Sequence, residues 1–265
     1  MRKLSVITRL LSLCLVAVLW CSSRFACAQA SAGASPQVPS WALPGSPTHS
    51  QVPPPPGFHR ASRTVVGPIG IFDGQSDVGG ALVEGSAHYD AAAHTYTVNS
   101  AGYNIWYSRD EFRYLWKRMS GDISLAADVT FPNPGGYGDR KAVLVIRQNL
   151  DDDAQEAMIG EHGTGMIHLA YRASRGAFLK DMEYRFGGEL SDIHARRIGI
   201  EKRGDSIAIF VSLKDEPMHQ FGPPIQLHFS GPFYVGIGFC SHQPVTIDTA
   251  VFTHVVLKNA AGKAR

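Results

Sequence analysis

The sequence has little cysteine, and no long apolar segment after its N-terminal region. Three of its four cysteines, Cys14, Cys21 and Cys27, lie close to the N-terminus, so Cys240 is alone in the rest of the chain. A single thiol forms no internal disulfide, and the folded part must therefore be held together by its hydrophobic core. No later segment has the roughly 20 apolar residues that a membrane-spanning helix needs.

The N-terminal residues have the order of a secretory signal peptide. Arg2–Arg9 is basic, Leu10–Leu19 is apolar, and Ala26–Ala28 provides the small residues of a cleavage site. We therefore expect residues 1–28 to be removed, with cleavage after Ala30 as a second option. The mature protein would then be exported, to the periplasm or the extracellular space. A retained membrane anchor is the alternative.

Removal of this leader changes the net charge of the protein. Residues 1–28 contain four basic residues and no acidic residue, so the net charge of +2 for the whole chain becomes −2 for the mature chain. A mildly acidic protein without a basic tract is not attracted to nucleic acid or to anionic lipid. We expect neither of them as a partner, and no membrane span in the mature chain.

A proline-rich stretch follows the leader. Residues 29–64 contain eight of the sixteen prolines, four of them consecutive at Pro53–Pro56, and the rest is mostly small or polar. Such a composition buries too little apolar surface to fold, and the tetraproline favours an extended polyproline II conformation. The sequence thus predicts a disordered linker over 29–64, a folded domain over 65–258 and a disordered tail over 259–265.

The folded domain is predicted to consist of strands. After Ile69, short alternating runs are separated by turn residues, and no stretch of about 12 residues has a helical period. The expected strands lie near 81–90, 94–99, 103–107, 112–118, 121–131, 141–148, 155–161, 165–172, 180–186, 196–203, 206–213, 225–229, 232–241 and 246–257. Strands at this density without helices indicate an all-β sandwich or a barrel.

The alternation also assigns the faces of individual strands. In 121–131, Ile123, Leu125, Ala127, Val129 and Phe131 share one side. In 232–241, Val235, Ile237 and Phe239 share one side, and the other carries Tyr234, Gly236, Gly238, Cys240 and His242. Glycine weakens a strand, so two glycines on one face indicate that a ligand, or another part of the protein, approaches the backbone there.

Several short motifs along the domain resemble one known family. They are Ala87-His88-Tyr89-Asp90, Thr95-Tyr96-Thr97-Val98, Asn104-Ile105-Trp106, Asp110-Glu111-Phe112-Arg113-Tyr114, Ser120-Gly121-Asp122-Ile123, Val145-Ile146-Arg147-Gln148 and Tyr234-Val235-Gly236-Ile237. Their order resembles the regulation-of-enolase-like branch of the concanavalin A-like lectin and glucanase superfamily, over about Asp77 to Leu257. The resemblance implies a two-sheet antiparallel jelly-roll sandwich. Asn104, and Gln148 with Asn149, depart from the usual pattern.

Catalysis on this fold has a recognisable signature that the sequence lacks. Retaining glycanases use a Glu-x-Asp-x-x-Glu strand whose acids lie about 5 Å apart, and no Glu-x-Asp occurs in this chain. Glu156 and Glu161 are five residues apart, which places them on opposite faces of a strand. We predict no catalytic residue, although a polysaccharide lyase built on scattered His, Tyr and Arg residues stays open.

Metal binding has only weak signals. His162 and His168 are six residues apart across a predicted turn, so they could approach each other on adjacent strands. Hydrogen-bonded or solvated histidines are more common than zinc ligands, and the consecutive acids Asp151–Asp153 point in different directions. We therefore predict no metal and no cofactor.

The predicted ligand-binding residues are Arg147, Tyr234, His242, Trp106 and Tyr114. Aromatic rings bind the C–H face of a sugar, and an arginine within an apolar strand must face a polar groove or pair with an acid. The alternatives are a structural core for Trp106 and an internal ion pair for Arg147.

These observations predict a noncatalytic, glycan-binding module with a groove on one sheet. The alternative is a protein-interaction module that acts beside an envelope partner such as a TolB-like propeller. A polysaccharide lyase or hydrolase is the third option.

Overall fold

The computed structural model describes residues 40, 43, 55, 57–188 and 193–263. The predicted leader, most of the predicted linker, and the cysteines Cys14, Cys21 and Cys27 lie outside these residues. Within the described part, no helix is long and apolar enough to cross a membrane.

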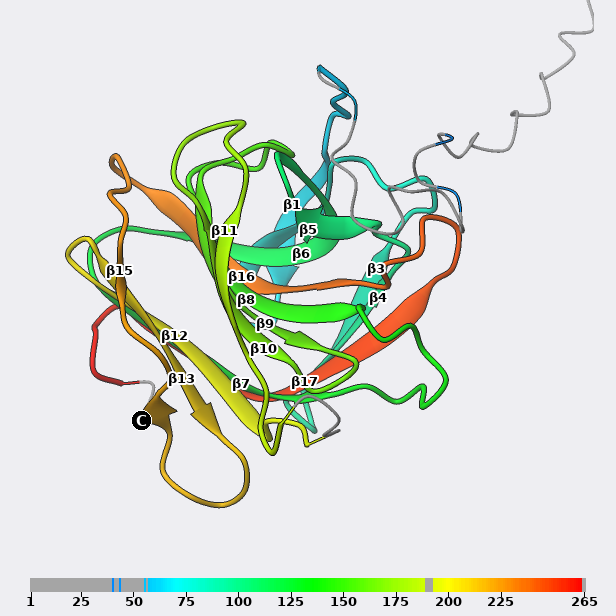
Figure 1. The fold of residues 1–265 in the computed structure, drawn as a ribbon. Helices are drawn as coiled ribbons and strands as arrows, with labels where there is room; N and C mark the ends of the chain where they lie inside the picture. The colour runs from blue at the N-terminus through cyan, green and yellow to red at the C-terminus, as the bar shows by residue number, and fades with distance from the viewer. Residues whose placement is uncertain (1–39, 41–42, 44–54, 56, 189–192, 264–265) are drawn as a thin grey trace, which may run out of the picture. The chain divides into compact units, whose positions relative to one another are not determined.

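The described residues form two antiparallel β-sheets (Figure 1). The first sheet has nine strands in the order β1–β2–β6–β16–β8–β9–β10–β11, with β5 beside β6. Their bounds are β1 Arg63–Ile69, β2 Phe72–Val78, β5 Asn104–Trp106, β6 Arg109–Met119, β8 Lys141–Arg147, β9 Glu156–His162, β10 Ile167–Arg172, β11 Lys180–Tyr184 and β16 Phe233–Cys240.

The second sheet has eight strands in the order β14–β13–β12–β7–β17–β4–β3, with β15 beside β13. Their bounds are β3 Ser86–Asp90, β4 Thr95–Ser100, β7 Ile123–Thr130, β12 Arg197–Arg203, β13 Ser206–Ser212, β14 His219–Gln220, β15 Ile225–Gln226 and β17 Asp248–Lys258. The predicted all-β, two-sheet antiparallel sandwich is therefore confirmed.

The strands that the sequence analysis missed are β1, β2 and β14, and β3 begins at Ser86 rather than at residue 81. The polar composition of β2 has no apolar alternation from which a strand could be predicted. Its Asp77 is fully buried, yet it accepts hydrogen bonds from the guanidinium of Arg63 and the backbone N–H of Gly85, and it forms an ion pair with Arg113. Ion pairing thus satisfies a side chain that an apolar pattern would not predict inside a sheet.

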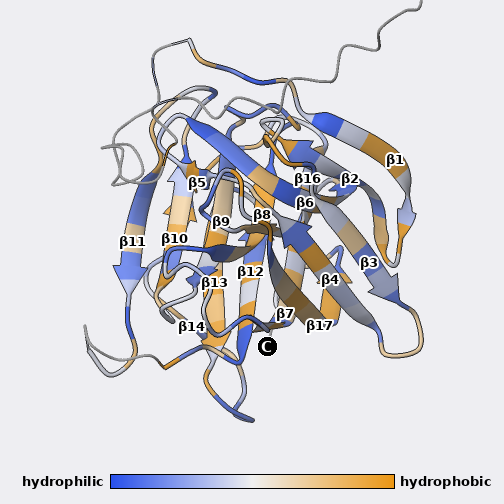
Figure 2. Cartoon of the chain, turned by 90° about the vertical axis from the view of Figure 1, so that its right-hand side faces the viewer, coloured by the Kyte–Doolittle hydropathy of each residue, from blue (hydrophilic) through white to orange (hydrophobic). Residues whose placement is uncertain are grey.

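The main core lies between the two sheets. The predicted inward faces are confirmed, because Ile123, Leu125 and Ala127 of β7 pack in one buried cluster with Val235, Ile237 and Phe239 of β16. In Figure 2, β9 and β10 carry hydrophobic bands, whereas β11 at the sheet edge is mainly hydrophilic.

A second core covers the outer face of the nine-stranded sheet. This outer core comprises Val78, Ile105, Phe112, Tyr114, Trp116, Val143, Val145, Met158, Ala170 and Cys240. Leu150 and Leu179, from two loops outside the strands, pack against it. The middle of this sheet is therefore buried on both faces, and only part of its outer face is open to a ligand.

The two glycines of β16 make room for this packing. A Cβ at Gly236 would overlap the carbonyl oxygen of Leu115, and a Cβ at Gly238 would lie 2.7 Å from the ring of Phe112. Both of these neighbours belong to β6, the adjacent strand. The sequence analysis left open whether a ligand or another part of the protein approaches these glycines. The structure shows that strand β6 of the protein itself does so.

Residues just outside the predicted domain boundaries also contact the sandwich. Nδ1 of His59 lies 2.9 Å from Oδ1 of Asp152, and the backbone N–H of Arg60 donates to the same carboxylate at 3.1 Å. At the other end, the backbone N–H of Gly262 donates to Oε2 of Glu201 at 2.8 Å. The folded domain thus extends beyond 65–258 at both ends.

Candidate functional site

The outer face of strands β8 to β11 carries polar side chains toward one end. Lys141 of β8 lies opposite His162 of β9, Gly160 of β9 lies opposite His168 of β10, and His168 lies opposite Glu183 of β11. Residues directly opposite in a sheet point to the same side. The register therefore gathers a lysine, two histidines and a glutamate on one face.

These side chains surround a small pocket with a volume of about 30 Å³. It is lined by Asn104, Trp106, Asp139, Lys141, His162, Met166, Glu183 and His242, which we call the polar pocket. A volume of this size holds a water molecule or a small ion, since about 10–15 Å³ is the minimum for one water. It admits one substituent of a larger ligand rather than a whole sugar ring.

Lys141 is a buried residue in the lining of the polar pocket. Its buried ammonium donates to Oδ1 of Asn104 at 2.7 Å and to the carbonyl oxygen of Ile105 at 3.2 Å, and it lies 4.9 Å from the ring centre of Trp106. Burial lowers the pKa of Lys141 from its usual value. The contacts with Asn104 and the indole fix the ammonium in place.

His162 and His168 contact each other, an approach that their spacing across a turn had left possible. Their ring centres are 4.8 Å apart in an edge-to-face arrangement. Burial lowers the pKa of both imidazoles well below the usual value, so both rings are neutral at neutral pH. Among the described residues, no hydrogen-bond partner contacts either ring nitrogen of His168.

The space for the His168 ring is created by its cross-strand neighbour. A Cβ at Gly160 would overlap Nε2 of His168, so only glycine at position 160 leaves room for the imidazole. The indole of Trp106 stacks nearly parallel to the imidazole, with ring centres 6.0 Å apart. Gly160 and Trp106 together hold this ring on the outer face of the sheet.

Two carboxylates lie beside His168 on the edge strand β11. A nitrogen of His168 and carboxylate oxygens of Asp181 and Glu183 all lie within 4.8 Å of one another. Burial raises the pKa of both Asp181 and Glu183. His59, Asp152 and Asp153 form the second group in the described part of the chain with donor atoms this close.

His242 closes the polar pocket at the end of β16. Its ring stacks on Tyr137, with centres 5.2 Å apart, and on Tyr103, with centres 5.8 Å apart. Its backbone has a φ of 63° and donates to the carbonyl oxygen of Gly102 at 3.0 Å. The structure thus brings two predicted ligand-binding residues, Trp106 and His242, to one pocket.

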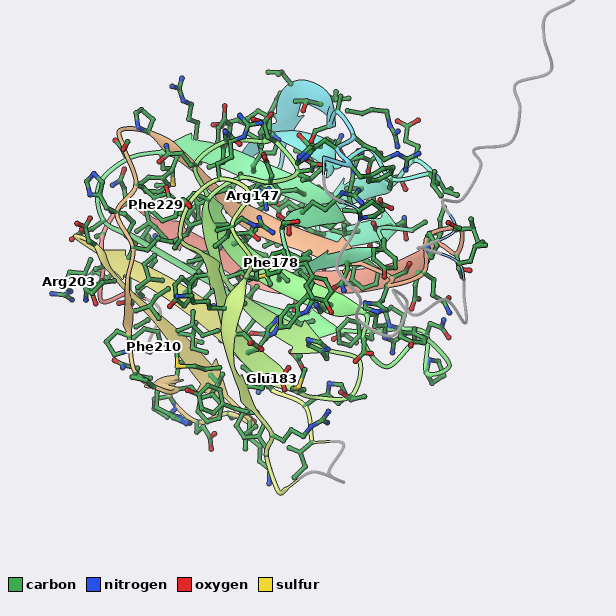
Figure 3. The ribbon with its side chains drawn as sticks, turned by 45° about the horizontal axis from the view of Figure 1, so that its top comes forward. Arg147, Phe178, Glu183, Arg203, Phe210 and Phe229 are labelled. Carbon is green, nitrogen blue, oxygen red and sulfur yellow. The ribbon has the colours of Figure 1, made fainter. Side chains whose placement is uncertain are left out.

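Arg147, in contrast, is enclosed within the outer face (Figure 3). Its Nη1 donates to Oδ2 of Asp110 at 2.7 Å and to the carboxylate of Glu156. Arg172 donates to both oxygens of Asp110 at 2.7 Å and to Oε1 of Glu156 at 3.2 Å. The internal ion pair, the alternative to a groove, is therefore the observed arrangement.

The four side chains Asp110, Arg147, Glu156 and Arg172 form a charge-balanced quartet with no exposed surface. Burial, with a contribution from Asp110, raises the pKa of Glu156 to about 7, although the two guanidinium groups oppose this shift. The same guanidinium groups hold the pKa of Asp110 below its usual value. The quartet therefore has a structural role.

Tyr114 and Tyr234 also lie away from the polar pocket. The hydroxyl of Tyr114 donates to the carbonyl oxygen of Val145 at 3.1 Å, and its ring belongs to the outer core. Tyr234 is half-buried, edge-to-face on Trp116 with ring centres 5.2 Å apart. Neither residue lines the polar pocket, and Arg147 has no exposed surface, so the predicted residues Arg147, Tyr234 and His242 do not come together at the polar pocket.

The comparisons with known proteins relate this chain to others by fold. No protein-family model and no curated protein sequence matches it. Similar solved structures include a functionally unknown protein from Saccharomyces cerevisiae, with a TM-score of 0.50 and 15% identity over 67% of this chain and 93% of that one. The fold is thus an all-β sandwich of two antiparallel sheets, as predicted.

Two further similar structures have assigned activities. The carbohydrate-binding module CBM66 from Bacillus subtilis matches with a TM-score of 0.44 and 14% identity, over 76% of this chain and 96% of that one. An alginate lyase from Klebsiella pneumoniae matches with a TM-score of 0.40 and 10% identity, over 67% and 85% of the two chains.

The sequence analysis missed the pocket residues Lys141 and Glu183, and it missed Asp181, which lies beside Glu183 and His168. Asp181 and Glu183 alternate along an edge strand, which is also the pattern of a solvated face. Lys141 begins a strand, where a lysine is usually exposed. The pair His162 and His168 was the one indication in the sequence. Lys141 and Glu183 lie on the two strands that flank these histidines.

Proposed function

We propose that this chain is an exported, noncatalytic glycan-binding module of the regulation-of-enolase-like branch, and that it binds sugar at the polar pocket. The observation that carries the proposal is the partly exposed Trp106, whose indole lies beside the ammonium of Lys141 and lines the same pocket as Glu183. An aromatic face with a few fixed polar groups is the usual composition of a sugar site.

The size of the polar pocket defines how a sugar would bind. At about 30 Å³ it accepts one hydroxyl or carboxylate substituent, while the ring remains at the surface against Trp106. The carboxylates of Asp139 and Glu183 accept hydrogen bonds from hydroxyls, and Lys141 donates to an oxygen. This arrangement predicts recognition of a terminal or protruding sugar.

A glycan array of the purified full-length chain tests the proposal. We expect Trp106→Ala to weaken binding of the bound glycan by about tenfold or more, which corresponds to 1.4 kcal/mol. Tyr89→Ala is the matched control, because Tyr89 is a half-buried aromatic residue of the eight-stranded sheet and should leave binding unchanged.

Three outcomes would overturn the proposal. They are the absence of any bound glycan, equal binding by Trp106→Ala and wild type, and cleavage of the bound glycan during incubation with the protein. The last outcome, followed as new reducing ends or as unsaturated uronate products, would place the domain among the lyases or hydrolases.

A further inference from the structure

We propose that His168, Asp181 and Glu183 form a binding site for a divalent transition-metal ion, with Zn²⁺ as the chemical type. We call these three residues the imidazole–carboxylate cluster. One nitrogen of His168 and one oxygen of each acid lie within 4.8 Å of one another. A combination of neutral imidazole and carboxylate donors is the ligand set that zinc and similar ions prefer.

His168 is the observation that points to a ligand. Its side chain is fully buried, and among the described residues neither ring nitrogen has a hydrogen-bond partner. An imidazole always offers one lone pair or one N–H at each nitrogen, and leaving both unsatisfied in a buried place costs free energy. A metal ion at one nitrogen would remove part of that cost.

The backbone register builds this arrangement. His168 lies directly opposite Glu183, and Asp181 lies opposite Ala170, so all three cluster residues point to the outer face of the sheet. Gly160, on the other side of His168, leaves space for the ring. The cluster residues therefore come from two paired strands, which hold them more precisely than loops would.

The distances are compatible with coordination after small side-chain movements. Zinc bonds to imidazole nitrogen and carboxylate oxygen are about 2.0–2.2 Å long, which places tetrahedral ligands roughly 3.4 Å apart. Asp181 is half-buried and Glu183 is exposed, so both side chains can rotate inward. Glu183 also lines the polar pocket, which gives the ion an open coordination position.

The surrounding charges favour a cation. Asp139, Asp181 and Glu183 place three acidic side chains in and beside the polar pocket, close to the cations of Lys141 and Arg185, and Asp181 and Glu183 are hydrogen-bonded to each other. Lys141 is already held by Asn104 and Ile105. His162, whose ring centre lies 4.8 Å from that of His168, has no hydrogen-bond partner at either ring nitrogen among the described residues and can approach as a fourth ligand.

The second group of close donor atoms, His59 with Asp152 and Asp153, has carboxylates that already have cationic partners. Asp152 in that group already accepts from the backbone of Arg60 and contacts Arg109, and Asp153 pairs with Arg175. Arginines thus neutralise the carboxylates near His59. We assign the metal site to the imidazole–carboxylate cluster for this reason.

The metal proposal shares Glu183 with the proposed sugar site, but it is tested without any sugar. The full-length chain, freed of metal with a chelator, is titrated with ZnCl₂ by calorimetry and with Co²⁺ by absorption spectroscopy. We expect one ion per chain at the imidazole–carboxylate cluster, with Co²⁺ d–d bands to which no thiolate of the folded domain contributes. Any background from Cys14, Cys21 and Cys27 is the same in every variant.

Variants locate the ion. Glu183→Gln, an isosteric change at an exposed position, should weaken Zn²⁺ binding by about tenfold or more, and so should Asp181→Asn and His168→Ala. Glu84→Gln and His59→Ala are the matched controls and should bind as wild type does. Glu183→Gln keeps the test decisive even if His168→Ala does not fold.

Two results would overturn the assignment. One is the absence of stoichiometric Zn²⁺ binding by the wild type. The other is Zn²⁺ binding that persists unchanged in Glu183→Gln and Asp181→Asn, or that His59→Ala removes. Metal binding with no glycan bound would refute the proposed function alone, and glycan binding without metal would refute the metal site alone.

Discussion

The guanidinium of Arg147 and the carboxylate of Asp110 lie 2.7 Å apart, and neither side chain has any exposed surface. The two residues are 37 positions apart in the sequence. Arg172 contacts the same carboxylate from β10, and Glu156 contacts both arginines from β9. The sheet thus carries a closed set of two positive and two negative groups, and the removal of any one of them leaves a buried charge without its partner.

We predict that Arg147→Ala lowers the free energy of unfolding by about 3–5 kcal/mol, the usual cost of breaking a buried ion pair on one side. Denaturant unfolding of the purified protein measures this change. Arg203→Ala, at an exposed arginine, is the control and should change stability by less than about 0.5 kcal/mol. A small effect of Arg147→Ala, equal to that of the control, would contradict the structural role of the quartet.

The quartet also predicts how stability depends on pH. Because burial raises the pKa of Glu156 to about 7, the folded protein keeps a proton that the unfolded chain loses near the ordinary glutamate pKa of 4.5. The contribution of this proton to stability is complete below pH 4.5 and is lost as the pH rises through about 7.

Glu156→Gln, which cannot titrate, should therefore lose less stability than wild type between pH 5 and pH 8 (roughly the interval around these two pKa values). Urea midpoints of the two proteins across this interval measure the difference. Parallel curves for wild type and Glu156→Gln would mean that Glu156 is ionised throughout.

The strand pattern was predictable from the sequence because it depends on neighbours along the chain. The alternation of Val235, Ile237 and Phe239 directly identifies the face that packs between the sheets. The same alternation does not tell whether the opposite face is exposed. Here, Ile105 of β5 and loop residues such as Leu150 cover that face, and this depends on how distant segments fold over the sheet.

The candidate site was predictable only in part, for a related reason. Trp106 and His242 stood out by residue type, and the approach of His162 to His168 followed from a short turn. Arg147 was ambiguous, because its partners come from two other strands and from the loop between β8 and β9. The contact of His168 with Glu183 depends on the pairing of β10 with β11, which residue spacing alone does not give.

Cys240 should be unreactive in the folded protein. Its thiol is fully buried in the outer core, and burial raises its pKa to about 11, so almost no thiolate forms at neutral pH. We expect a thiol reagent to modify equal numbers of cysteines in folded wild type and folded Cys240→Ser. One additional thiol should react in wild type after denaturation. Rapid modification of Cys240 in the native state would show that the outer core opens.

We further predict that Cys240→Ser changes the free energy of unfolding by less than about 1.5 kcal/mol, since the two side chains have similar volumes. Denaturant unfolding measures this change, with Cys240→Ala as the control that introduces no hydroxyl into the outer core. A much larger loss in both variants would identify the thiol as a tightly packed group. A large loss in Cys240→Ser alone would reflect the cost of a buried hydroxyl.

The close approach of β6 to β16 provides the last prediction. An alanine Cβ at position 236 would overlap the carbonyl oxygen of Leu115, a backbone atom fixed by its own strand pairing. The strands must therefore separate locally, and we expect Gly236→Ala to lower the free energy of unfolding by about 1–3 kcal/mol or more.

Gly67→Ala is the matched control, because Gly67 also lies in a strand of the same sheet but has no atom within 4 Å of an added Cβ. Both variants also lose the flexibility of glycine in the unfolded chain, an effect that stabilises the folded protein by roughly 0.4–1 kcal/mol. The difference between the two variants in denaturant unfolding isolates the contact, and equal stabilities would show that β6 and β16 are not packed this closely.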